Sequence, residues 1–348
     1  MSRKIYWQGH ATLMNLQAKV LMLALCAMLG WHASAAASDR PNILLVIIDT
    51  LRADRLEAQR GGLLVMPNLK GLADGAVSFT QAYAQETFTK PSVTSIMTSL
   101  YPDVHGVRLG IIDPERQLPE SMRSKMEISV DVLSPDLPTL AKILKGTGYT
   151  TGAVQANPQL APECGFSEGF DEYLCLFNAK ADVVLEKALS MLESLSTPCF
   201  LYVHFMDPHM PYSPPGQFVK RFGPAPQITD QDRWLFQLYR AYYIDLILHG
   251  TALNKTRDFG TFSTSGREYV RFMYGAEVNF ADEQLPVLLS ALRKKGGSNI
   301  MVVTSDHGEE FWEHGSVGHV KTAYRELAHV PLVFISEKWQ AQRVDIPV

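Results

Sequence analysis

The stretches ILLVIIDT (residues 43–50) and IMVVTSDH (residues 300–307) together predict the fold. Each is an apolar segment that ends in a carboxylate. Uninterrupted Val, Ile and Leu residues are typical of parallel strands that are covered on both faces. Ligands of open α/β sheets bind at the carboxyl ends of such strands. We therefore expect Asp49 and the pair Asp306–His307 to converge on one crevice and share one metal ion.

The rest of the chain alternates strands with helices, which predicts an α/β protein with a mostly parallel central sheet and helices on both faces. Strands are expected at residues 43–48, 151–155, 199–205 and 300–304, and helices at 67–74, 91–99, 137–145, 181–195 and 277–294. Residues 40–348 are expected to form one domain. An insertion at about 210–271 has no clear period and is either a lid or substrate wall, or a surface excursion.

Composition excludes several kinds of partner. The chain is 46% hydrophobic and 20% charged, with a net charge of −4, which is typical of a folded domain with a substantial core. Without an excess of basic residues, we expect no nucleic-acid partner and no general affinity for anionic membranes. The expected partner is a small molecule or a glycan, and the oligomeric state stays undefined.

The N-terminus has the order of a secretory signal peptide. Basic residues such as Arg3 precede an apolar segment at 20–31, and small residues follow at 33–37. We therefore expect residues 1–35 to be removed by cleavage after Ala35, giving a periplasmic or secreted protein without stable membrane insertion. The apolar segment is short for a bilayer span, and an uncleaved anchor is the alternative.

Three cysteines follow that segment. Cys164 and Cys175 either close a short disulfide loop in an oxidising compartment or remain free. Cys199 is expected to be a buried thiol in a strand. None of the three has metal-ligand spacing.

The segment Thr89-Lys90-Pro91 predicts a helix N-terminus, because proline is favoured in the first helical turn and Ser or Thr just before it. Unpaired N–H groups and the helix dipole stabilise an anion or a developing alkoxide at such a position. Two interpretations of Thr89 are open from these residues alone. It is either a nucleophile or only the N-cap of the helix.

Several further polar residues fall near the predicted strand ends. His209 follows the strand expected at 199–205, and we expect it to be functional, whereas His204 lies inside that strand and is expected to serve packing. Asp282 lies on the apolar stripe of the helix expected at 277–294, so we expect a buried carboxylate that neighbouring donors satisfy. The loop residues Glu309, Glu310 and His314 are expected not to be ligands.

Five phrases of this sequence occur in the order of a known family. They are NILLVIIDTLRAD (42–54), a nucleophile segment ending TSLYPDVHGV (98–107), DPHMPY (207–212), TSDHGE (304–309) and GH (318–319). In this order they resemble the sulfatase branch of the alkaline phosphatase superfamily, from about residue 41 to residue 348. The resemblance implies that superfamily's α/β fold and a metal-dependent hydrolase of sulfate or phosphate esters.

The resemblance also implies a metal site. Asp49, Asp306 and His307 correspond to metal ligands, and Thr89 stands at the position of the nucleophile, which also contacts the ion. A bound divalent ion polarises an ester and lowers the pKa of a coordinated hydroxyl. One imidazole with several oxygens suits Mn²⁺ or Zn²⁺ better than Ca²⁺ or Mg²⁺, which stay possible.

Three more residues receive roles from the resemblance. His209 and His319 resemble the histidines that hold the transferred group or protonate the leaving oxygen, a task that suits a group titrating near neutral pH. Lys321, two residues past His319, is expected either to contact a sulfate or phosphate oxygen or to be a solvated surface lysine.

The sequence departs from the sulfatase pattern at the nucleophile. Classical members have Cys or Ser at the position of Thr89, oxidised to formylglycine, and Arg at the position of Val93. Threonine is a secondary alcohol and cannot give that aldehyde, so we expect a threonine alkoxide, as in the phosphoethanolamine transferases and lipoteichoic acid synthases of the superfamily. A second departure is Thr50, where an acidic residue often follows the first metal aspartate.

Two alternatives to a hydrolase stay open. One is a phosphoethanolamine-type head-group transferase, and the other is a non-catalytic relative that binds an anionic glycan. The sequence ends at Val348, where the family usually continues into a helix and a small C-terminal subdomain. A domain that is truncated and lacks this subdomain is one interpretation of that ending.

Overall fold

The computed structural model describes residues 40–108, 131–249, 261–319 and 322–348, with side chains left undescribed at 242–249. The predicted signal peptide and Lys321 lie outside the described residues. Within these ranges, no helix is both long enough and apolar enough to cross a membrane.

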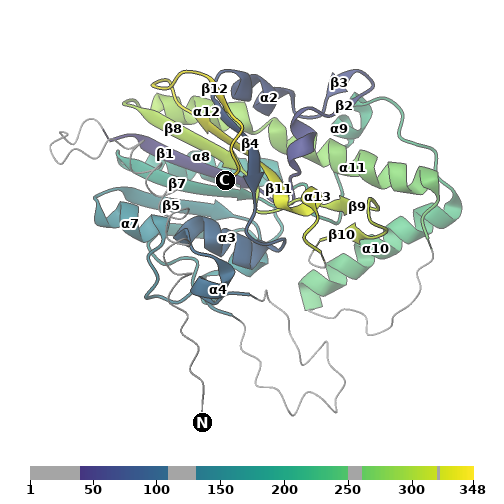
Figure 1. The fold of residues 1–348 in the computed structure, drawn as a ribbon, viewed down its shortest axis with the longest axis horizontal. Coiled ribbons are helices and arrows are strands. Elements are labelled where there is room, and N and C mark those ends of the chain that lie inside the picture. Colours follow the sequence, from purple (N-terminus) through teal and green to yellow (C-terminus); the bar gives the residue numbers. More distant parts are fainter. Residues whose placement is uncertain (1–39, 109–130, 250–260, 320–321) are drawn as a thin grey trace, which may run out of the picture.

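An eight-stranded sheet forms the centre of the molecule, in the order β12-β4-β11-β8-β1-β7-β5-β6 (Figure 1). Its strands are β1 (Asn42–Ile48), β4 (Val77–Tyr83), β5 (Thr150–Gln155), β6 (Glu172–Cys175), β7 (Cys199–Phe205), β8 (Asn299–Thr304), β11 (His329–Ile335) and β12 (Gln342–Val344). The five strands from β8 to β6 are parallel, whereas β11 pairs antiparallel with both β8 and β4. The predicted fold class, a mostly parallel α/β sheet, is confirmed.

Strand β1 lies in the middle of this sheet. Its Leu45 pairs with Tyr202 of β7 on one side and with Val302 of β8 on the other. All seven residues of β1 are buried, since helices cover both faces, and this explains the continuous apolar sequence. The carboxyl ends of three parallel neighbours therefore lie together at one edge.

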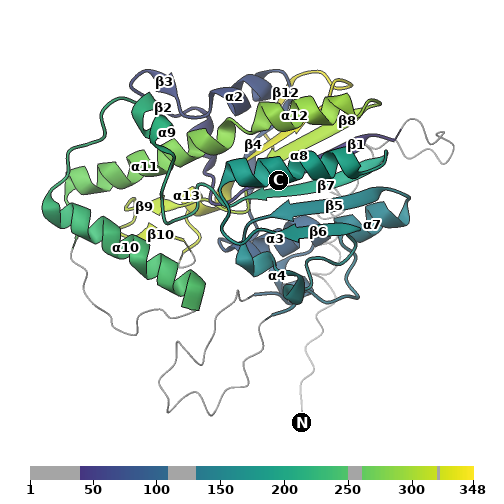
Figure 2. The same cartoon turned by 180° about the vertical axis from the view of Figure 1, so that it is seen from behind.

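Helices form a layer on each face of the sheet (Figures 1 and 2). One layer has α2 (Pro67–Asp74), α8 (Ala181–Ser194), α11 (Thr264–Asp282) and α12 (Leu285–Lys294), and the other has α3 (Thr89–Thr98), α4 (Pro102–His105) and α7 (Leu140–Gly146). The first layer packs on the sheet through buried residues such as Leu69 and Leu288. The second does so through Val93 and Leu144.

The remaining helices lie beyond the carboxyl edge of the parallel strands (Figure 2). The region predicted as an insertion contains α9 (Gly216–Arg221), α10 (Asp230–His249) and the start of α11. Two shorter elements complete this side: the hairpin of β9 (Glu310–Phe311) with β10 (Val317–Gly318), and α13 (Arg325–Ala328).

One sequence prediction is wrong. The single helix expected at 277–294 is two helices, because α11 ends at Asp282 and α12 begins at Leu285 with Pro286 in its first turn. Proline has no N–H to donate and favours a helix start at this point. Of the two alternatives left open for Cys164 and Cys175, the structure has free thiols. Cys199 is buried, as expected.

Candidate active site

Asp49, Asp306 and His307 meet at the carboxyl edge of the sheet. Asp49 directly follows β1, and the other two come two and three residues after β8. All three are fully buried, and one ligand atom of each lies within 4.8 Å of the others. The structure thus brings the three predicted metal ligands together.

In each carboxylate of this cluster, one oxygen accepts hydrogen bonds from the protein and the other has no hydrogen-bond partner. Oδ2 of Asp49 accepts hydrogen bonds from Nδ2 of Asn157 at 2.7 Å and Nε2 of His204 at 3.1 Å. Oδ1 of Asp306 accepts from the backbone N–H groups of Thr50 and His307, at 3.2 and 2.9 Å. The other oxygens, Oδ1 of Asp49 and Oδ2 of Asp306, are buried without a hydrogen-bond partner.

A hydrogen bond to the backbone orients the imidazole of His307. Its Nδ1 lies 2.9 Å from the carbonyl oxygen of Gly308, so Nδ1 carries the proton and Nε2 keeps its lone pair. Nε2 is 3.5 Å from Oδ2 of Asp306. Two atoms that share an ion at bond lengths of about 2.1 Å lie roughly 3 to 3.5 Å apart. The three side chains therefore fit one divalent ion.

Local backbone geometry supports this arrangement. Thr50 has a φ of 56°, a left-handed conformation that is unusual for a β-branched residue, and its N–H reaches Asp306. At Gly308 any Cβ would lie 2.0 Å from the carbonyl oxygen of Glu326. Only glycine fits after His307, because the backbone of α13 lies too close to leave room for a side chain.

Thr89 faces this cluster. It is the first residue of α3 and fully buried, and its Oγ1 lies 3.4 Å from Nε2 of His307 and 3.3 Å from Nδ2 of Asn157. The N-cap of α3 is Phe88, and no side chain caps the helix. The interpretation of Thr89 as the N-cap is therefore wrong, and its hydroxyl contacts His307 and Asn157 instead.

Two histidines flank the cluster. The ring centroid of His319 is 4.5 Å from that of His307 and 4.9 Å from that of His209. Nδ1 of His319 lies 2.8 Å from Oε1 of Glu309, a fully buried carboxylate. The β9–β10 hairpin explains this contact. Glu310 pairs with Gly318, and this pairing brings Glu309, just before β9, close to His319, just after β10.

The two histidines differ in electrostatic environment. Burial alone would lower the pKa of His319, but the carboxylate of Glu309 raises it above its usual value. Burial lowers the pKa of His209, against the opposing effect of Asp49. The arrangement therefore stabilises the protonated form of His319 and the neutral form of His209.

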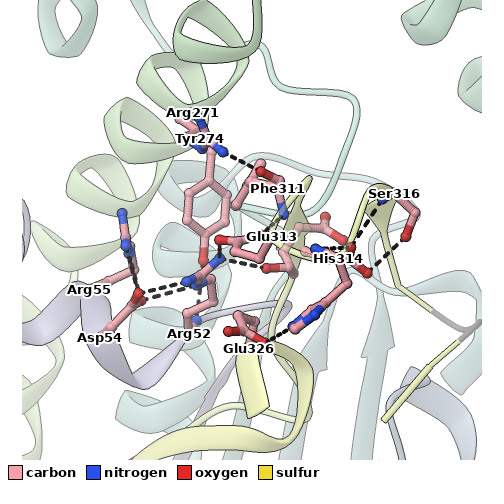
Figure 3. A network of polar contacts seen from close by, with 12 residues as sticks. Arg52, Asp54, Arg55, Arg271, Tyr274, Phe311, Glu313, His314, Ser316 and Glu326 are labelled. Carbon is pink, nitrogen blue, oxygen red and sulfur yellow. Dashed lines mark hydrogen bonds and ion pairs between the residues drawn. The ribbon is translucent and has the colours of Figure 1, made fainter. Parts of the chain in front are cut away.

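A polar network fastens the segment after β1 and the β9–β10 hairpin to α11 (Figure 3). The guanidinium of Arg52 donates to the backbone oxygen of Glu309 and pairs with Glu313 at 2.6 Å and Asp54 at 2.7 Å. The hydroxyl of Tyr274 donates to the carbonyl of Thr50 at 2.9 Å. The segment after β1 and the hairpin that carries His319 are thus held by one set of contacts.

Sequence reasoning missed or misjudged three residues of the site. Asn157 was missed because nothing marks an asparagine after a strand as special. His204 serves more than packing, since its imidazole donates to Asp49 and contacts the hydroxyl of Tyr202 at 2.6 Å. Glu309, expected to be an uninvolved loop residue, positions His319. The expectation holds for Glu310, which accepts hydrogen bonds from its own hairpin.

His314 and Asp282 behave as expected. His314 is 3.1 Å from Glu326, outside the cluster. Asp282 accepts hydrogen bonds from the backbone N–H groups of Asn68 and Leu69, both at 2.8 Å. It is a buried carboxylate satisfied by neighbouring donors.

Comparison with known proteins agrees with this geometry. The family model described as Sulfatase matches residues 41–348. The chain belongs to the sulfatase family. Human iduronate 2-sulfatase is 26% identical to this sulfatase-family chain over 373 residues, which cover 90% of the chain and 63% of the human protein. The chain thus spans less than two thirds of that relative's length.

Solved structures share the fold. A phosphonate monoester hydrolase from Silicibacter pomeroyi superposes with a TM-score of 0.63 at 20% identity, covering 89% of this chain and 71% of that one. The C-terminal periplasmic domain of a phosphoethanolamine transferase from Campylobacter jejuni has a TM-score of 0.58 at 17% identity, covering 86% and 80%. These likenesses place the sulfatase-family chain in the alkaline phosphatase-like fold.

Proposed function

We propose that this sulfatase-family protein is a metal-dependent hydrolase of sulfate or phosphate esters of a small molecule or glycan, with Thr89 as the nucleophile and no formylglycine. The observation that carries the proposal is the position of the Thr89 hydroxyl, 3.4 Å from Nε2 of His307 in a cluster with two carboxylate oxygens that have no hydrogen-bond partner. Residues 40–348 form its catalytic domain in this proposal.

The ion would be held by Asp49, Asp306 and His307, together with the oxygen of Thr89. When bound, it polarises the ester and stabilises the deprotonated form of a nearby hydroxyl. Mn²⁺ or Zn²⁺ suits this mixture of oxygen and imidazole ligands best, while Ca²⁺ and Mg²⁺ remain candidates.

Thr89, after its hydroxyl has lost its proton to solvent, attacks the sulfur or phosphorus atom, and the bond to the leaving oxygen breaks. The electron pair of that bond goes to the leaving oxygen, which takes a proton from His319, the histidine that Glu309 keeps protonated. Water then attacks the same sulfur or phosphorus atom and releases sulfate or phosphate, and the Thr89 oxygen recovers a proton. His209, neutral and beside His319, is placed to bind the transferred group or to accept a proton from that water.

A turnover assay with variants tests this function. We expect the metal-loaded protein to hydrolyse at least one of three matched aryl esters, a sulfate, a phosphate monoester and a phosphate diester. Thr89→Ala and Asp306→Ala should each lower turnover by about 10³-fold or more, whereas Thr98→Ala, a buried threonine on the same helix, should retain it. Unchanged turnover in Asp306→Ala would contradict the proposal.

A transferase is the second candidate. Its supporting observations are the threonine at the nucleophile position and the likeness to the phosphoethanolamine transferase domain. In this case an acceptor alcohol, rather than water, takes the group from Thr89. Product analysis with and without an added alcohol separates the two, because a transferase forms a new ester in proportion to the acceptor.

We also propose a periplasmic or secreted location. It is supported only by the order of basic, apolar and small residues in the first 37 positions. N-terminal sequencing of the exported protein tests it, with a mature chain beginning at Ala36 as the expected result.

A further inference from the structure

Lys90, the residue after Thr89, is buried without a partner. Its side chain is fully excluded from solvent, and Nζ has no hydrogen-bond partner in the described part of the chain. No ion pair of Lys90 is found there either. A buried ammonium that nothing neutralises is strongly unfavourable, so its presence points to an anion that binds beside it.

Two other cations of this protein contact carboxyl groups. Nζ of Lys180, whose side chain is 40% exposed, lies 2.7 Å from carboxyl oxygens of both Asp207 and Glu277. Arg52, whose side chain is 8% exposed, binds two carboxylates. Lys90, in contrast, has no such partner among the described residues.

The position of Lys90 in its helix relates the ammonium to Thr89. Helical side chains tilt toward the N-terminus of their helix, and Lys90 is the second residue of the ten-residue α3. A long side chain at this position carries its end toward the start of the helix, where Thr89 stands. The dipole of α3 and its uncapped first turn favour an anion at the same place.

A second polar atom without a partner lies next to this helix end. The hydroxyl of Thr87, just before α3, donates to the backbone oxygen of Thr322 at 2.8 Å. The hydroxyl oxygen of Thr322 itself is buried and has no hydrogen-bond partner. The ammonium of Lys90 and the hydroxyl of Thr322 are both donors that suit the oxygens of a tetrahedral oxyanion.

We propose that Lys90 binds a non-bridging oxygen of the sulfuryl or phosphoryl group while that group is attached to, or attacked by, Thr89. The proposal rests on the function proposed above and adds a catalytic residue to it. The proposed metal ligands follow strands β1 and β8, whereas Lys90 belongs to helix α3 and supplies positive charge from there. Negative charge that develops on the transferred group is then neutralised from two elements.

Melting of the metal-loaded full chain tests this role with inorganic sulfate and inorganic phosphate as probes. Millimolar concentrations at constant ionic strength avoid the general stabilisation that concentrated sulfate gives to any protein. We expect at least one of the two anions to raise the melting temperature of the wild type in a saturable way. Lys90→Met should melt higher than the wild type without anion, because it removes an unpaired charge, and should bind the anion at least tenfold more weakly.

Lys187→Met, at an exposed lysine on α8, is the matched control and should respond to the anions as the wild type does. In turnover assays, Lys90→Met should lower kcat/KM by about 10²- to 10³-fold. The proposal is overturned if neither anion stabilises the wild type, if Lys90→Met responds as strongly as the wild type, or if it melts lower without anion. If no ester is turned over but the anion response depends on Lys90, this inference stands and the catalytic proposal falls.

Discussion

At the scale of single residues, the candidate site is marked by buried polar atoms that have no hydrogen-bond partner. Oδ1 of Asp49 and Oδ2 of Asp306 have no hydrogen-bond partner, although the second oxygen of each carboxylate is well bound. Buried polar atoms are nearly always satisfied in folded proteins. Two such exceptions beside the imidazole of His307 are the basis for proposing a metal ion here.

Glu309→Gln should lower kcat without unfolding the protein. The buried carboxylate holds Nδ1 of His319 at 2.8 Å and stabilises its protonated form, and a neutral amide does this poorly. We expect a decrease in kcat of about 10- to 100-fold, typical for a residue that orients a catalytic histidine. Steady-state kinetics on the best ester measures it.

Tyr212→Phe is the control for that variant. The hydroxyl of Tyr212 donates to the other oxygen of Glu309 at 2.9 Å, so its loss leaves the contact with His319 in place. A change of less than about tenfold in kcat is expected. Equal kcat values in the wild type and Glu309→Gln would show that Glu309 does not act through His319.

At the scale of elements, continuous apolar strands could be predicted and interrupted ones could not. The strands β1, β7 and β8 are buried along almost their whole length, and this environment leaves a sequence signal. Strand β4 is only partly buried, β6 has four residues, and β11 contains Pro331. Such strands have no clear period, and their pairing is determined by neighbours distant in sequence.

Asp282→Ala should destabilise the protein by about 2 kcal/mol. This carboxylate accepts from the backbone N–H groups of Asn68 and Leu69 in the first turn of α2, and its loss leaves buried donors unsatisfied. Urea unfolding followed by circular dichroism measures the change. Glu283→Ala, which breaks only a partly exposed ion pair with Arg221, should cost less than about 1 kcal/mol; equal losses would refute the capping role.

Glu277 makes the stability of the junction between α8, α11 and the loop after β7 depend on pH. Burial and the nearby Asp207 raise the pKa of Glu277 to about 8, although Lys180 opposes the shift. The folded protein then keeps a proton that the unfolded chain loses near pH 4.5. Between these values the free energy of unfolding falls as pH rises, by at most about 1.4 kcal/mol per pH unit.

Glu277→Gln should remove this dependence, since glutamine keeps the oxygen that binds Lys180 and the N–H of Ser213. Urea unfolding at pH 6 and pH 9 should therefore show the variant gaining stability relative to the wild type at the higher pH. Glu283→Gln, at a partly exposed carboxylate, should keep the slope of the wild type. A parallel pH dependence of the wild type and Glu277→Gln would refute the assignment.

At the scale of the whole molecule, the sheet joins residues from distant parts of the chain. Thr50 and Asp306 are 256 positions apart and share a hydrogen bond. Their meeting could be predicted, because parallel strands deliver their carboxyl ends to one edge. Asn157 and Glu309 could not be predicted, since their roles come from the side chains beside them and not from any pattern in their own segments.

Removing the metal should weaken the whole fold. An ion that binds only the folded protein adds about 2.7 kcal/mol to the free energy of unfolding at 100 times its Kd, and the ligands here follow two central strands. Chelation should lower the melting temperature by several degrees and abolish turnover, and Mn²⁺ or Zn²⁺ should restore both. Asp306→Ala should melt at one temperature with or without metal; a metal response as large as that of the wild type would remove Asp306 from the site.

Mass spectrometry of the metal-loaded protein, quenched during turnover of the aryl sulfate and phosphate esters, tests the central claim most directly. The account predicts a sulfuryl or phosphoryl adduct on the peptide that contains Thr89, absent from Thr89→Ala. The mass of the adduct also identifies the transferred group. Turnover that continues in Thr89→Ala, or an adduct found only on another residue, would contradict the account.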